Sequence, residues 1–302
     1  MNAITTAARA PAISSLGALF VVLWSSAWIA AKIGLPYAGP FTLLLIRFGA
    51  AGAVLLVVAL ASGAPWPEKL ADYGHLAVAG MLIQGLALGC AYFALQLGVS
   101  AGISGLINGL APLFTTLGTV PFLGERVGRR QWLGLSAGLI GVALVVIDRV
   151  SFAGANWQGY AVMFAALAAL VCGTLYQKKH CTGMDLRTGS LVQLAAASAV
   201  VFLPALSREG LEVEWNWTLI LASSWLSIAN SIGAFSLLYV LLRSGEASRV
   251  SALFYLVPPI TAIMGFAAFH ETLSPAALVG FAITVGGVYL GTRQEAPPQA
   301  EA

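Results

Sequence analysis

Ten apolar stretches, each about 20 residues long, dominate this sequence and limit what it can fold into. A helix needs about 20 apolar residues to cross the hydrocarbon core of a bilayer. A soluble domain carries about 25% charged residues, whereas this chain has 9% charged and 59% hydrophobic residues. The sequence therefore predicts an all-α integral membrane protein with ten transmembrane helices. Their expected ranges are 14–34, 40–61, 74–97, 102–122, 130–148, 158–177, 187–206, 217–241, 248–269 and 275–292.

The positively charged residues predict how these spans are oriented. With a cytoplasmic N-terminus, eleven of the fifteen Lys and Arg residues fall on the cytoplasmic side and three on the other, while Arg47 lies inside the second span. Cytoplasmic loops of membrane proteins carry an excess of Lys and Arg. We therefore expect a multi-pass protein of the cell inner membrane with both termini in the cytoplasm. Residues 1–13 and 293–302 would be cytoplasmic tails, and the second of these is expected to be disordered.

The second half of the chain repeats features of the first half at a shift of 146 residues. Pro112 and Glu125 correspond to Pro258 and Glu271. Each half contains five spans, an odd number, so the second half would enter the bilayer from the opposite face. Inverted-repeat transporters have this arrangement, with a substrate site near the midplane between the repeats. We therefore predict two inverted five-helix repeats, residues 14–148 and 158–292. Further pairs at this shift are Gly134 and Gly280, Gly141 and Gly287, and Lys32 and Lys178.

Several of these motifs resemble the EamA-like family of the drug/metabolite transporter superfamily. The similar segments are "FLGERVGRRQWLG" from Phe122, its looser copy "FHETLSPAALVG" from Phe269, "WSSAWIAAKIGL" from Trp24 and "PFTLLLIRF" from Pro40. The resemblance covers nearly the whole chain. It implies ten helices in two inverted repeats, and a secondary transporter of small metabolites such as amino acids or related solutes, often moved outward.

Two side-chain amides, Gln84 and Asn230, are the leading candidates for substrate binding. They are related by the shift of 146, and each falls near the middle of its span. A two-fold axis through the midplane would bring both amides into one layer, where they could hydrogen-bond a polar substrate. The alternative is that each amide joins neighbouring helices, since polar groups at this depth need some partner.

Arg47 and Gln193 form a second matched pair of candidates. Arg47 lies about 10 Å into the second span, at 1.5 Å per residue, and an arginine inside a membrane is a functional candidate. Its side chain could instead reach toward the outer interface and make structural bonds. Gln193 occupies the matching place in the seventh span, with the same two interpretations.

Prolines predict breaks in two spans. Asn108 precedes Pro112 by four residues, so the proline frees the Asn108 carbonyl and opens the helix beside a polar amide. An opened helix can line a cavity. Pro258 and Pro259 are expected to act in the same way in the ninth span. The alternative at both places is a kink that serves packing alone.

Two aromatic residues and two glutamates complete the set of candidates. Trp28 and Tyr255 are expected to line the pocket, although most aromatic residues in such proteins serve packing or the interface. Glu125 and Glu271 end their helices on opposite faces of the membrane. Each could be a gate that pairs with a basic group in one state, or could fix a tight helical hairpin.

Missing features narrow the function further. All twelve acidic residues lie in loops, tails or span ends, which argues against a central carboxylate proton relay and favours neutral, zwitterionic or anionic substrates. No catalytic, metal-binding or cofactor-binding motif is present, so we predict no enzyme. The net charge of +3 forms no basic stripe for nucleic acid. We expect a monomer, because one chain holds both repeats. A passive channel and a non-catalytic membrane assembly factor stay as alternatives.

Overall fold

The computed structural model describes residues 15–123, 128–152, 157–234, 237, 241, 253–254, 256–271 and 274–292. Helices occur at all ten predicted spans, although the eighth and ninth spans are described only in part. Five helical stretches among these residues are long and apolar enough to cross a bilayer, and shorter apolar helices accompany them. The predicted all-helical membrane architecture is therefore confirmed.

The first five predicted spans contain eight helical segments. They are α1 (Ser15–Gly34), α2 (Pro40–Ala61), α3 (Leu70–Gly80), η1 (Met81–Leu86), α4 (Ala87–Gln96), α5 (Ala101–Asn108), α6 (Ala111–Leu123) and α7 (Arg129–Phe152). The third span is continuous through α3, η1 and α4, and η1 is π-helical. The fourth span is interrupted between α5 and α6, and α7 extends four residues past its expected end at position 148.

The second five spans follow the same order. They contain α8 (Trp157–His180), α9 (Leu186–Glu209), α10 (Trp217–Ser224), the π-helical η2 (Trp225–Ala234), α13 (Val257–Phe269) and α14 (Pro275–Thr292). Side chains in the connecting loops cap several of these helices. Asp185, Asn216 and Ser274 accept hydrogen bonds from backbone N–H groups in the first turns of α9, α10 and α14.

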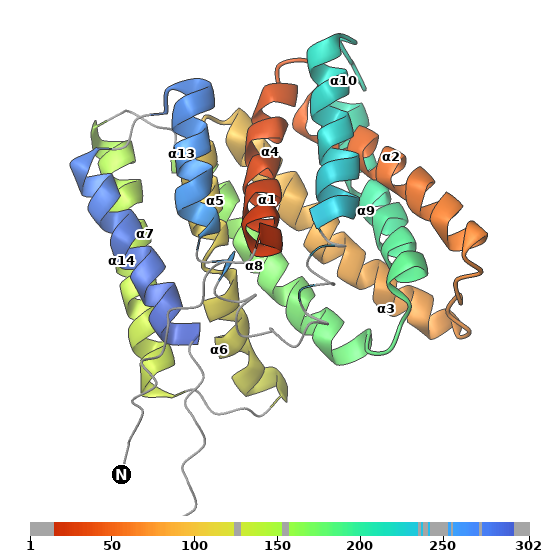
Figure 1. Cartoon of the computed structure of the whole chain (residues 1–302), viewed down its shortest axis with the longest axis horizontal. Coiled ribbons are helices and arrows are strands. Elements are labelled where there is room, and N and C mark those ends of the chain that lie inside the picture. The colour runs from red at the N-terminus through yellow and green to blue at the C-terminus, as the bar shows by residue number, and fades with distance from the viewer. Residues whose placement is uncertain are drawn as a thin grey trace, which may run out of the picture.

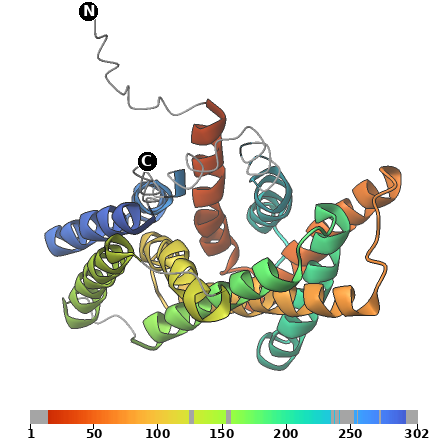
Figure 2. The ribbon, with the colours of Figure 1, turned by 90° about the horizontal axis from the view of Figure 1, so that it is seen from below.

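Two helix pairs, α7 with α14 and α2 with α9, lie on opposite flanks of the molecule (Figures 1 and 2). Glycines allow α7 and α14 to approach closely. A Cβ atom on Gly141 would lie 2.5 Å from the Gly280 carbonyl oxygen, and one on Gly287 would lie 2.7 Å from that of Gly134. No other residue type could occupy these crossing points without moving a backbone.

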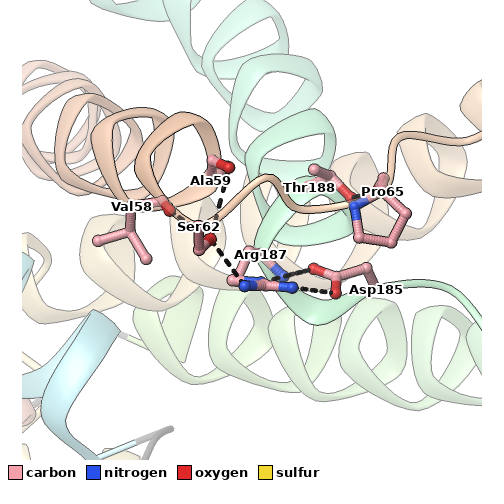
Figure 3. Close-up of polar contacts among 7 residues, drawn as sticks. All are labelled: Val58, Ala59, Ser62, Pro65, Asp185, Arg187 and Thr188. Carbon is pink, nitrogen blue, oxygen red and sulfur yellow. Dashed lines mark hydrogen bonds and ion pairs between the residues drawn. The ribbon is translucent and has the colours of Figure 1, made fainter.

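Polar contacts hold both ends of the α2–α9 pair. At one end, the Glu209 carboxylate accepts hydrogen bonds from the backbone N–H groups of Phe41 and Thr42, at 3.0 and 2.7 Å, in the first turn of α2. At the other end, Arg187 Nη1 donates to Ser62 Oγ (2.7 Å) and also pairs with Asp185 (Figure 3). Polar contacts therefore add to the apolar packing that holds α2 against α9.

Helix α1 lies between α13 on one side and α10–η2 on the other (Figure 1). Both neighbours belong to the second half of the sequence, and polar contacts supplement the packing. Ser25 Oγ donates to the Val257 carbonyl in α13 (3.3 Å), and Trp225 Nε1 donates to Ser26 Oγ (2.8 Å). The first helix is therefore embedded in the second half of the chain.

Candidate functional site

Gln84 and Asn230, the two matched amides, both lie in π-helical segments. Shifting η1 (Met81–Leu86) by 146 residues places it on 227–232, inside η2. π-Helical segments are rare and are frequent at functional sites. The sequence did not predict that both segments are π-helical. The repeat shows which residues match, but it does not show which backbone groups are hydrogen-bonded.

Asn230 is buried and bonded to α1. With its amide oriented to satisfy its neighbours, Nδ2 donates to the Leu23 carbonyl (2.7 Å) and Oδ1 accepts from Trp225 Nε1 (3.3 Å). Because Trp225 also donates to Ser26, the three side chains tie η2 to α1. The alternative interpretation of Asn230, as a link between helices, describes these contacts. A role toward substrate stays a prediction.

Gln84 has different surroundings. Its side chain is partly exposed, and its amide makes no hydrogen bond within the described residues. Around it, η1 packs closely against α8 and α9, where Gly173 and Gly85 leave room for apolar neighbours. A polar side chain inside an apolar span needs a partner, and the predicted contact of Gln84 with substrate stays a prediction.

Arg47 joins three helices. The residue is only 7% exposed. Its Nη1 donates to the Tyr92 hydroxyl in α4 (2.7 Å) and its Nε donates to Ser231 Oγ in η2 (3.1 Å). The sequence did not predict either partner, since no pattern identifies which hydroxyls a long side chain will reach. The guanidinium therefore points into the protein and not toward the interface.

Gln193, the counterpart of Arg47, lies where α3 and α9 touch. A Cβ atom on Gly80 would overlap the Gln193 backbone, so the two helices are in direct contact at this point. The Gln193 side chain is 8% exposed. This position favours a packing role for Gln193, and its predicted contact with substrate stays a prediction.

The structure places the proline candidates at helix boundaries. The helix is interrupted at Gly109 and Leu110, between Asn108 and Pro112, as the sequence predicts. Pro258 and Pro259 likewise lie in the first turn of a helix, because α13 begins at Val257 just as α6 begins at Ala111. Pro is well accommodated there because first-turn N–H groups have no partner within the helix. Pro112 and Pro258 therefore hold the same place in the two halves, each as the second residue of its helix, and their predicted role in lining a cavity stays a prediction.

A small hollow lies beside these boundaries, lined mainly by apolar residues of α5, α13 and α14. It includes Pro258 among the predicted residues and is separate from the bonds of Arg47 and Asn230. Its lining residues are Leu106, Gly109, Phe254, Pro258, Thr284, Val285 and Val288. Trp28 is buried in the apolar core, 8% exposed, and Tyr255 lies outside the described residues.

Glu271 makes the contacts that the gate interpretation requires. Its carboxylate pairs with Lys32 Nζ near the end of α1. It also accepts hydrogen bonds from the backbone N–H groups of Ala101 (3.1 Å) and Gly102 (3.4 Å), at the N-terminus of α5. A helix N-terminus attracts negative charge. One carboxylate therefore ties α1, α5 and α13 together.

The sequence predicted a role for Glu271 but did not identify Lys32 as its partner. The matched position of Lys32 and Lys178 in the repeat was the available signal. Lys32 also lies over the Phe269 ring, 4.8 Å from its centroid. Glu125, the counterpart of Glu271, lies outside the described residues.

The family model described as "EamA-like transporter family" matches the chain twice, over residues 12–147 and 157–293.

The chain belongs to the EamA-like transporter family. A relative in Escherichia coli K12, named "Uncharacterized inner membrane transporter YedA", is 24% identical and covers 91% of this chain and 90% of the relative. A "Probable terminal-alkyne amino-acid exporter" of Streptantibioticus cattleyicolor is 29% identical over 94% of both chains. A crystal structure 23% identical in sequence has a TM-score of 0.62, covers 92% of this chain and 96% of its own, and shows the fold alone.

Membership in the EamA-like family settles the broad class. The protein is a multi-pass inner-membrane transporter and not an enzyme. The resemblance read from the proline–glutamate motifs is therefore confirmed.

Proposed function

We propose that this EamA-like protein is a secondary transporter that exports small polar metabolites, such as amino acids or related solutes, by alternating access. The single observation that carries the proposal is the set of contacts at Glu271. A gate must hold helices from both halves together in one state and release them in another. Glu271 follows α13 in the second half and binds Lys32 and the α5 N-terminus in the first half.

The proposed architecture is two inverted five-helix repeats, residues 14–148 and 158–292. Two family-model matches of similar length support the duplication. The glycine contacts between α7 and α14 support a two-fold relation. Exchanging the two halves converts the Gly141–Gly280 contact into the Gly287–Gly134 contact, and both occur. A pair of contacts that exchange in this way is typical of an isologous interface.

The charge bias supports an orientation with both termini in the cytoplasm. Glu271 and Lys32 would then lie at the outer end, and Glu125 and Lys178 at the inner end. The conformation described here would be closed toward the outside. The name of the S. cattleyicolor relative supports an outward direction and an amino-acid type of solute.

The gate is tested by labelling a residue below it. Ser104 is fully buried on α5, one turn beyond the N–H groups that Glu271 binds. After Cys90, Cys172 and Cys181 are replaced by Ala, Ser104→Cys should react slowly with a membrane-impermeant maleimide added outside. Adding Glu271→Gln should speed the reaction about tenfold, because a hydrogen bond to a charged group contributes ~1.5–3 kcal/mol.

Glu209→Gln is the matched control. This carboxylate caps α2 at the same end but does not join α1, α5 and α13. It should leave the labelling rate unchanged. Equal labelling in the Glu271 variant and the wild type would overturn the gate. Cysteines at positions 125 and 271 that label from the same side would overturn the inverted arrangement.

Transport itself is tested by counterflow in proteoliposomes. A carrier accelerates uptake of labelled amino acids when unlabelled amino acids are present inside, whereas a passive channel does not. No flux of any small polar solute would favour an assembly role over transport.

A further inference from the structure

The guanidinium of Arg47 is an unusual charge for its place in the protein. It lies inside α2, is almost fully buried, and contacts α4 and η2. No carboxylate among the described residues lies within 4.0 Å of it, since both ion pairs there involve other cations. A buried charge without a counter-ion is strongly unfavourable. Among the residues that the structure describes, the site therefore has a positive charge in excess.

The donors at this site also outnumber its acceptors. An arginine side chain has five N–H donors, and Arg47 uses one for Tyr92 and one for Ser231. The Ser231 hydroxyl donates its own proton to the Leu226 carbonyl (3.0 Å), so it is satisfied. The Tyr92 hydroxyl accepts from Arg47, and within the described residues its proton has no acceptor. Three N–H groups of Arg47 and the O–H group of Tyr92 thus have no acceptor among the described residues.

A carboxylate fits this set of donors better than a neutral group does. Planar guanidinium groups bind carboxylates through two parallel hydrogen bonds, and a charge-assisted bond is about twice as strong as a neutral one. Gln193, the counterpart of Arg47, is neutral. Only the first half of the protein therefore carries a positive charge at this pair of positions. One such charge suits a solute with a single anionic group.

We propose that Arg47 and Tyr92 form a carboxylate-binding subsite, and that the transported solutes carry a carboxylate. This inference rests on the proposed transport function and names the substrate class. Ser231 and Tyr92 position the guanidinium, and the solute supplies the missing counter-ion. A cationic amine without a carboxylate would be repelled by the same charge.

The experiment uses purified full-length protein in liposomes and a pool of radiolabelled protein amino acids as the probe. Counterflow of this pool is measured against an excess of unlabelled amino acids, of the same amino acids as α-carboxamides, or of lactate and succinate. We expect the free amino acids to compete about 10- to 100-fold better than their amides, the range of a lost charge-assisted hydrogen bond. Competition by lactate and succinate would show that the carboxylate suffices without the amine.

Variants separate binding from folding. Arg47→Gln and Tyr92→Phe should reduce the preference for acids over amides, whereas Arg47→Lys should keep part of it by keeping the charge. Arg208→Gln, at the end of α9, is the control and should leave the preference intact. A purely structural Arg47 would change the amount of folded protein, measured by size-exclusion chromatography, without changing the acid-to-amide preference.

Each outcome has a distinct meaning. Amides that compete as well as acids would overturn the carboxylate subsite and leave the transport function intact. The same holds if the acid-to-amide preference survives in Arg47→Gln. No counterflow of any pool would overturn the transport function itself, and the subsite with it.

Discussion

The π-helical segments η1 and η2 hold equivalent positions in the repeat but have different surroundings. In η2, Ser227 bonds to the Arg47 carbonyl (3.3 Å), Ser231 bonds to the Arg47 side chain, and Asn230 bonds to α1. In η1, the counterparts of the two serines are Met81 and Gly85. Within the described residues, Gln84 makes no hydrogen bond. One segment is tied by polar bonds, and the other is held by close packing.

The difference shows that two matched segments of a duplicated sequence can have different hydrogen bonding. Where two halves meet along glycines, as in α7 and α14, paired contacts are retained because both helices must approach equally. Where side chains determine the contacts, as in η1 and η2, the two segments differ: η2 makes polar bonds, and η1 packs closely against its neighbours. We interpret η2 as the anchored half of the site and η1 as the half that is open to a ligand.

The largest expected effect tests the part of the molecule where the halves are equivalent. Gly141→Ala and Gly287→Ala each place a methyl group against a backbone oxygen. Each should lower the free energy of unfolding by about 1–3 kcal/mol, the typical cost of overpacking, and by similar amounts. Thermal unfolding in detergent measures this. Gly286→Ala is the control, because a Cβ atom there has open space. Clearly unequal effects would contradict the paired contacts.

The second prediction tests whether the amides of Asn230 and Gln84 have different roles. Asn230→Ala removes bonds to Leu23 and Trp225 and should cost about 1–2 kcal/mol of stability, whereas Gln84→Ala should cost less than about 0.5 kcal/mol. Both should reduce counterflow of labelled amino acids. Thermal unfolding and counterflow on the same preparations separate the two roles. Normal transport by both variants would remove these amides from the site.

The smallest effect concerns how the equivalent helices α2 and α9 begin. Asp185 caps α9 with its own side chain, whereas its counterpart Gly39 cannot, so Glu209 from α9 caps α2 instead. The hydrogen bond from Arg187 lowers the pKa of Asp185 from 3.8 to about 2. A lowered carboxyl pKa contributes stability that is complete above the unfolded value and is lost as the pH falls.

We therefore expect a small loss of stability as the pH falls from about 4 to 2, where Asp185 becomes protonated. Thermal unfolding across this range, compared with Asp185→Asn, measures it. The variant should show a weaker dependence on pH. An identical dependence in both proteins would show that this cap contributes nothing.

The sequence alone determined the class of fold, the helix positions and the family. Long apolar runs have few stable arrangements in a bilayer, and the proline–glutamate motifs recur at a fixed shift. It also identified Glu271 and Arg47, since charges beside or inside apolar spans are conspicuous. Only the tertiary structure decided their partners: Lys32 and the α5 N-terminus for Glu271, and Tyr92 and Ser231 for Arg47. These partners lie far apart along the chain, and hydrogen bonds reach only a few ångströms, so helix packing alone determines which groups meet.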